Sequence, residues 1–130
     1  MQFDEFVGRV HNRAELASTG EALRAIRATL QTLSERVYFD EAQDLAAQLP
    51  REIGEYLTMV DDVESFSLGE FLDRVAERET VDLPDATYHA RVVIEVLGET
   101  VTPGKMDDIR AQLPDEYKPL FEAGSTGSMT

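Results

Sequence analysis

The sequence predicts an all-α protein in which two similar units of three to four helices pack into one helical bundle. Apolar residues recur at steps of three and four along most of the chain, which is typical of helices with one buried face. The chain also contains an internal repeat, and repeats of this length usually mark a helical unit that needs a neighbour to cover its apolar face. No segment of useful length alternates apolar and polar residues, as a half-buried strand would.

The repeat is clearest at residues 47–50, whose sequence AQLP returns at 111–114, an offset of 64 residues. Upstream of Ser18 the offset is 65, because the first copy holds one extra residue after Arg13. We therefore expect a single domain over residues 1–121. It divides into repeat one (about 3–57), a linker (58–66) and repeat two (about 67–121), followed by a Gly/Ser/Thr-rich flexible tail at 122–130.

The first helix of each unit carries Phe6 and Val10, or Phe71 and Val75, on one face. Ser67 precedes the second of these helices with the spacing of a capping box. The second helix is the longest, and it opens at Ser18 in one copy and at the aligned Asp82 in the other. Its apolar residues repeat at helical spacing in both copies, so we expect one face of this helix to point inward in each unit.

The third helix starts after Thr102-Pro103 in the second copy, and Pro50 and Pro114 then interrupt the chain before a short fourth helix. The positions that fall on the inner faces of these helices form the predicted core. They are Phe6, Val10, Ile26, Leu30, Leu33, Leu45, Leu49, Phe71, Val75, Ala90, Ile94, Leu97, Ile109 and Leu113.

The composition excludes several classes of function. The chain has 26 Asp and Glu against 12 Lys and Arg, a net charge of −14, so we expect no direct binding to nucleic acid. It has no cysteine, which excludes disulfides and thiol chemistry. With neither a basic, apolar leader nor a membrane-length apolar run, we expect a cytoplasmic protein that does not bind membranes. The acidic, Lys-poor composition indicates adaptation to high salt, or else a GC-rich genome combined with an acidic protein.

Two motifs resemble a known family. Phe-x-x-Arg-Val occurs at Phe6 and again at Phe71, and Asp-Leu-x-Ala-Gln-Leu-Pro-x-Glu closes each unit at residues 44–52 and, with Ile109 in place of Leu, at residues 108–116. These residues are similar to those of the domain of unknown function 2267 family, over residues 3–121. The resemblance implies a small helical prokaryotic protein. It implies no activity and no catalytic residues.

Candidate chemical groups are few. His11 and His89 lack the Glu-x-x-His spacing of a carboxylate-bridged metal site, and neither is kept at the aligned position of the other copy, so both are interpreted as surface or interface residues. The repeated acids, such as Glu35 and Glu99, are interpreted as caps and helix-surface ion pairs rather than an acid–base pair. The sequence thus predicts no catalytic residue, no cofactor and no metal ligand.

The repeated polar residues are the remaining candidates for a structural or interaction motif: Arg13, Arg78, Gln48, Pro50, Gln112 and Pro114. Each Gln precedes a Pro by two residues. We interpret its amide as a donor to carbonyls left free by that Pro, with recognition in a groove between the halves as the alternative. Each Arg lies where a first helix ends and complements its dipole, and a buried or interface ion pair is a second possibility.

Taken together, these observations predict a non-enzymatic cytoplasmic helical-repeat domain that binds a protein partner or associates with itself. One alternative is an acidic module that binds a basic protein. The other is a metal-dependent enzyme, which would require positioned groups that the sequence does not display.

Overall fold

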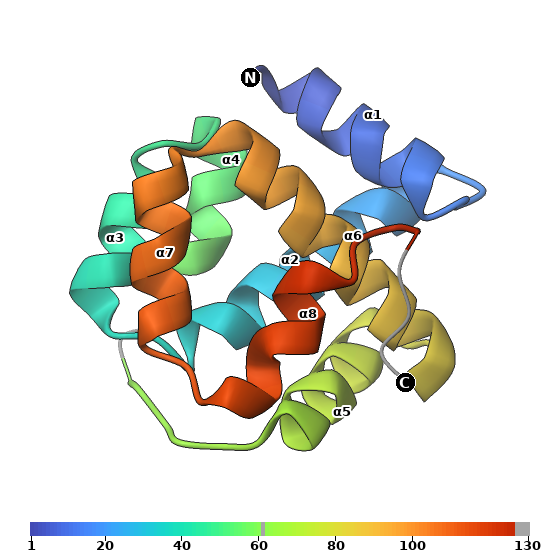
Figure 1. Ribbon diagram of the computed structural model, residues 1–130. Coiled ribbons are helices and arrows are strands. Elements are labelled where there is room, and N and C mark those ends of the chain that lie inside the picture. Colours follow the sequence, from blue (N-terminus) through green and yellow to red (C-terminus); the bar gives the residue numbers. More distant parts are fainter. Residues whose placement is uncertain (61, 127–130) are drawn as a thin grey trace.

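The computed structural model describes residues 1–60 and 62–126, and within them the fold is all-α with no strand. The N-terminal half contains α1 (Phe3–Arg13), α2 (Thr19–Ser34), α3 (Phe39–Ala46), α4 (Arg51–Gly54) and the 3-10 helix η1 (Glu55–Leu57). The C-terminal half contains α5 (Leu68–Glu79), α6 (Leu83–Thr100), α7 (Pro103–Ala111), the 3-10 helix η2 (Asp115–Tyr117) and α8 (Lys118–Glu122). The α-helices are labelled in Figure 1.

The helix starts lie where the sequence predicts them. Ser18, Ser67, Asp82 and Thr102 each accept a hydrogen bond from the backbone N–H three residues ahead, which satisfies one of the free donors of the first turn. The carbonyl oxygens of Pro50 and Pro114 accept the first hydrogen bonds of α4 and η2. The prolines therefore begin the last short helices as well as ending the preceding ones.

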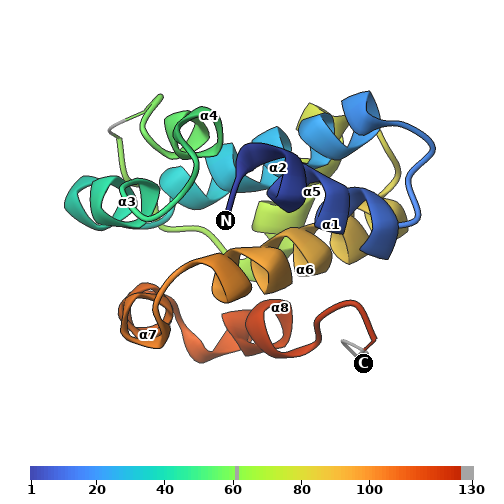
Figure 2. The ribbon, with the colours of Figure 1, turned by 90° about the horizontal axis from the view of Figure 1, so that it is seen from above.

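The two longest helices, α2 and α6, pack against each other at the centre, and each also contacts a helix from the opposite half. Helix α1 lies against both α2 and α6, and α5 also lies against both (Figures 1 and 2). Helices α3 and α7 lie side by side at one end of the molecule, on the left in both views. The two halves are thus interlocked through the contacts of α1, α2, α5 and α6.

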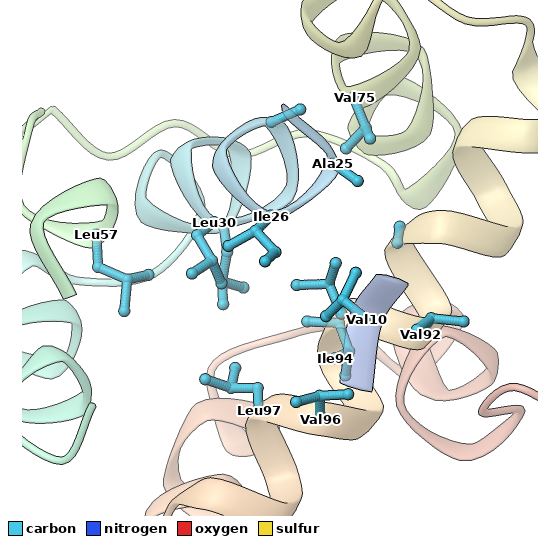
Figure 3. Close-up of a cluster of buried hydrophobic side chains, with 14 of the residues drawn as sticks. Val10, Ala25, Ile26, Leu30, Leu57, Val75, Val92, Ile94, Val96 and Leu97 are labelled. Atoms are coloured by element: carbon cyan, nitrogen blue, oxygen red, sulfur yellow. The ribbon is translucent and has the colours of Figure 1, made fainter. Parts of the chain in front are cut away.

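The core gathers apolar residues from both halves. Figure 3 shows Ile26 and Leu30 of α2 close to Ile94 and Leu97 of α6, with Val10 of α1 alongside. Of the predicted core positions, all are buried except Leu113, which is only partly buried. Leu113 lies beyond the end of α7, in the turn that precedes Pro114, so it no longer follows the inward face of that helix.

The segment between the halves is held at Phe66. Its carbonyl oxygen accepts hydrogen bonds from the Tyr117 hydroxyl at 2.7 Å and from Arg36 Nε at 3.0 Å. The guanidinium of Arg74 covers the Phe66 ring at 3.9 Å from its centroid, a cation–π contact. Of the predicted flexible tail, residues 123–126 form a turn in which Ser125 N–H donates to Glu95, and residues 127–130 lie outside the described part.

Candidate functional site

Two arginines of the N-terminal half bind one glutamate of the C-terminal half. On α1, Arg9 Nη1 lies 2.7 Å from Glu99 Oε1, and Arg13 Nη1 lies 2.6 Å from Glu99 Oε2. Glu99 comes from the last turn of α6. The hydrogen bond from Arg13, followed by one from Arg9, lowers the pKa of Glu99, and the same contact with Glu99 raises the pKa of Arg13. This network joins α1 to α6 across the two halves.

The reciprocal network joins α5 to the end of α2. Arg74 Nη1 lies 3.1 Å from Glu35 Oε1, and Arg78 Nη2 lies 2.8 Å from Glu35 Oε2. Burial by itself raises the pKa of Glu35, but the bonds from Arg78 and Arg74 outweigh burial and lower it. The participants stand 64 or 65 residues from Glu99, Arg9 and Arg13. Each half therefore supplies two arginines to a glutamate of the other.

The two glutamines also contact the opposite half in a reciprocal way. Gln48 Oε1 accepts a hydrogen bond from the Thr102 N–H at 2.8 Å, and Gln112 Oε1 accepts one from the Tyr38 N–H at 2.9 Å. Thr102 and Tyr38 are the N-cap residues of α7 and α3, and each belongs to the opposite half. Our interpretation of these amides as donors to local carbonyls was therefore wrong. The amide oxygen acts instead, and its partner lies in the other half.

Of the six predicted motif residues, four therefore lie at contacts between the halves: Arg13, Arg78, Gln48 and Gln112. Pro50 and Pro114 do not join these contacts, and serve as N-caps of short helices. The interpretation of repeated acids as members of helix-surface ion pairs is confirmed within α1 and α5, where Arg9 pairs with Glu5 at 2.7 Å and Arg74 pairs with Glu70 at 2.6 Å. The repeated polar residues thus hold the scaffold together.

A second group of polar residues lies where α5 turns into α6. His89 Nδ1 is hydrogen-bonded to Glu79 Oε2, and both residues are buried, with 7% and 2% of their surfaces exposed. The other carboxylate oxygen, Glu79 Oε1, is buried without a hydrogen-bond partner among the described residues. A buried carboxyl group without its hydrogen-bond partners lowers the stability of the fold. Removal of His89 would therefore leave Glu79 with no partner in the described part of the chain and destabilise the protein.

The pair borders a cleft of about 430 Å³ between the α1–α2 turn and the α5–α6 turn. Acidic side chains dominate its polar lining, with Arg24 as the one arginine. Thr80, next to Glu79, and Glu15, on the facing turn, have φ angles of +63° and +53°. Residues other than glycine rarely adopt this left-handed backbone conformation, so both turns carry backbone strain beside the cleft. The cleft is lined by Ala14, Glu15, Leu16, Ala17, Glu21, Arg24, Glu79, Val81, Asp85, Tyr88 and His89.

The described residues hold no group of three or more His, Asp or Glu side chains that could bind a metal ion, and none of their helices is long and apolar enough to cross a lipid bilayer. A comparison with protein families matches residues 3–120 to the uncharacterized conserved protein family DUF2267. The chain belongs to the DUF2267 family. A comparison with curated proteins finds no match.

The match to DUF2267 spans both the polar contacts between the halves and the His89–Glu79 pair. Sequence reasoning found the former because they repeat at a fixed offset. It missed Glu79 and misplaced His89, which is buried rather than at a surface. The aligned positions are Ala14 and Ala25, so a signal was present: a polar pair that replaces two alanines at related positions.

Proposed function

We propose that the protein is a non-enzymatic cytoplasmic module in which two related helical units form one scaffold that acts by binding another protein or a second copy of itself. The two-unit organisation is supported by the exchanged contacts of Arg13 and Arg78 and of Gln48 and Gln112, which stand at offsets of 65 and 64 residues. Contacts kept in both units serve the shared fold. Binding is then the role of surfaces that the fold does not use.

The observation that carries this proposal is a set of exposed apolar side chains around the segment that links the halves. Tyr38 is 67% exposed, Met59 is 53% exposed and Val63 is 42% exposed. Tyr38 and Val63 line the same hollow, of about 260 Å³, together with Arg36. Tyr, Met and Arg are enriched in protein interfaces relative to other surfaces. Two large apolar side chains that share one hollow beside an arginine therefore indicate a protein contact more strongly than a single exposed apolar residue would.

Sedimentation velocity of the full chain tests the proposal, from about 1 μM to about 1 mM, the range over which weak complexes dissociate. We expect concentration-dependent association that weakens in Tyr38→Ser and in Val63→Ser. Leu83→Ser is the matched control, because Leu83 is also an exposed apolar residue, at the start of α6. A monomeric chain throughout the range would contradict self-association, and equal weakening by the control would contradict the assignment of this surface.

A basic protein partner is the second candidate, and the net charge of −14 favours it. Such a complex would weaken steeply with added salt, because screening shortens the range of charge attraction. The interface at Tyr38 and Val63 would respond much less, since burial of apolar surface does not weaken in sodium chloride. The salt dependence of any complex therefore separates the two candidates.

A further inference from the structure

Most arginines of this acidic chain have partners within the fold. Arg9, Arg13, Arg51, Arg74 and Arg78 each form an ion pair with a carboxylate. Arg24 and Arg27 are different: both are exposed on α2, and no hydrogen bond or ion pair joins either of them to the described residues. In a chain with 26 acidic residues and 12 Lys and Arg, two neighbouring arginines without a carboxylate are unexpected.

These two arginines share a hollow with a third. The hollow, of about 320 Å³, is lined by Arg24, Arg27, Ala28, Gln31, Arg78 and Thr80. We call it the arginine hollow. Every polar side chain in its lining can donate hydrogen bonds, and none is a carboxylate. Three guanidinium groups, an amide and a hydroxyl thus surround one space.

The helix dipole and the neighbouring like charges both disfavour this placement of Arg24 and Arg27 on α2. Arg24 lies in the second turn of α2, near the end where the helix dipole disfavours a positive charge. Arg27 follows three residues later, so the two like charges are neighbours on one face of the helix, which is mildly destabilising. No hydrogen bond or ion pair within the described residues offsets this repulsion, and an anion between the two side chains would remove it.

Arg78 is already held in position. Its Nη1 donates to Thr32 Oγ1 at 2.9 Å and its Nη2 donates to Glu35 at 2.8 Å, which fixes the guanidinium at the edge of the hollow. A fixed guanidinium loses less entropy when it binds a ligand than a free one does. Guanidinium groups match phosphate oxygens with paired hydrogen bonds. We propose that the arginine hollow binds a small ligand that carries a phosphoryl group.

The net charge of the protein selects a small ligand over a polymer or a membrane. A body with a charge of −14 repels a polyanion over the whole contact area, whereas a compact anion in the arginine hollow contacts a lining that contains no carboxylate. Screening at physiological salt shortens the reach of the surrounding carboxylates to about 8 Å and leaves direct hydrogen bonds in place. A single phosphoryl group can therefore bind where a nucleic acid or an anionic lipid surface would be repelled.

Titration of the full chain with pyrophosphate, at constant ionic strength, tests the proposal by the NMR shifts of backbone amides. We expect saturable shifts around Arg24, Arg27 and Thr80. Arg24→Gln and Arg27→Gln should each weaken binding about fivefold, the effect of one exposed charged contact, and the double variant should weaken it about 25-fold if the two contacts are independent. Both side chains are exposed, so the fold should be unaffected. Arg51→Gln removes an exposed arginine elsewhere, on α4, and should change nothing.

Parallel titrations identify the source of the anion. Citrate tests carboxylates, and phosphatidylcholine vesicles containing phosphatidic acid test a lipid headgroup. Pyrophosphate binding that depends on Arg24 and Arg27 and exceeds citrate binding supports the proposal. It is overturned if pyrophosphate does not saturate, if Arg51→Gln weakens binding as much, if citrate binds more tightly, or if only the vesicles bind. None of these results depends on whether the chain associates with itself.

Discussion

The two turns that border the cleft occupy related positions in the sequence but are built differently. At the α1–α2 turn, Ala14 and Ala25 are buried small apolar residues. At the α5–α6 turn, the aligned positions hold Glu79 and His89, buried and hydrogen-bonded to each other. The alanines show that the fold does not need a polar pair at such a turn. A buried polar pair stabilises a fold less than apolar packing does, and Glu79 Oε1 has no hydrogen-bond partner among the described residues, so stability alone does not explain this pair beside the cleft.

The sharpest test of this comparison is to remove one member of the polar pair. His89→Ala should destabilise the protein by about 3–5 kcal/mol, because it leaves the Glu79 carboxylate buried and unpaired. The double substitution Glu79→Ala with His89→Ala reproduces the residues of the first turn and should cost clearly less than the sum of the single changes. Urea unfolding of the three variants measures the coupling.

The control for this cycle is His11→Ala, on the half-buried face of α1, which should change the free energy of unfolding by less than about 0.5 kcal/mol. Additive costs for Glu79→Ala and His89→Ala would contradict the coupling between the two side chains. The comparison of the two turns would then carry no functional meaning.

The central helices should behave alike where the two turns do not. Leu33 of α2 and Leu97 of α6 are both fully buried and stand 64 residues apart. Leu33→Ala and Leu97→Ala should each destabilise the protein by about 2–5 kcal/mol, through lost burial and the cavity left behind. Chemical denaturation monitored by helical circular dichroism measures both. A cost of less than about 0.5 kcal/mol for one substitution beside a cost in the expected range for the other would show that the halves contribute unequally to the core.

Glu35 and Glu99, the two glutamates at the contacts between the halves, should differ in how much each contributes to stability. The side chain of Glu35 is 13% exposed and that of Glu99 is 35% exposed, so solvent screens Glu99 more. We expect Glu35→Gln to cost about 2 kcal/mol and Glu99→Gln about 1 kcal/mol, since partly buried charged contacts exceed exposed ones. Thermal unfolding at neutral pH compares them. A larger cost at Glu99 would contradict the screening argument.

The same glutamates give the protein a predictable response to acid. Both have a folded-state pKa below the ordinary carboxyl value of 4.5, so their stabilising contribution is fully present above that value. It is lost as the pH falls below 4.5 and through the folded-state pKa, because protonation removes the charge that the arginines bind. Each Gln variant should therefore lose less stability than the parent over this acid range, as unfolding midpoints measured against pH would reveal.

We expect the smallest effect on stability at Gln48 and Gln112, the two glutamines that contact the opposite half. Gln48→Ala and Gln112→Ala each remove an acceptor from an exposed N-cap N–H, which water can replace in part. Each should cost about 0.5–1 kcal/mol, within the range of helix caps. Gln48→Glu keeps an oxygen in place and should retain most of the stability, and it serves as the matched control. An equal loss in Gln48→Glu and Gln48→Ala would show that the accepted hydrogen bond is not what matters.

The sequence by itself determined the helices, their starts and nearly all of the core. A cap such as Ser67 and a stripe such as Ile26, Leu30 and Leu33 depend on residues within a turn or two of one another, so local physics specifies them. The repeat added the list of polar residues that matter to both halves. Leu113 marks the limit of this reasoning, because its burial depends on where α7 ends and how the chain then turns.

Only the tertiary structure decided the partners. Arg13 meets Glu99 across 86 residues of chain and Gln48 meets the Thr102 N–H across 54, and the pattern of either segment leaves that choice open. The burial of His89 against Glu79, and the meeting of Arg78 with Arg24 and Arg27 at one hollow, have the same origin. Such side chains meet only after the helices have packed. The packing is driven mainly by apolar burial, and because apolar burial is non-directional, the apolar pattern of the sequence does not specify which polar groups come together.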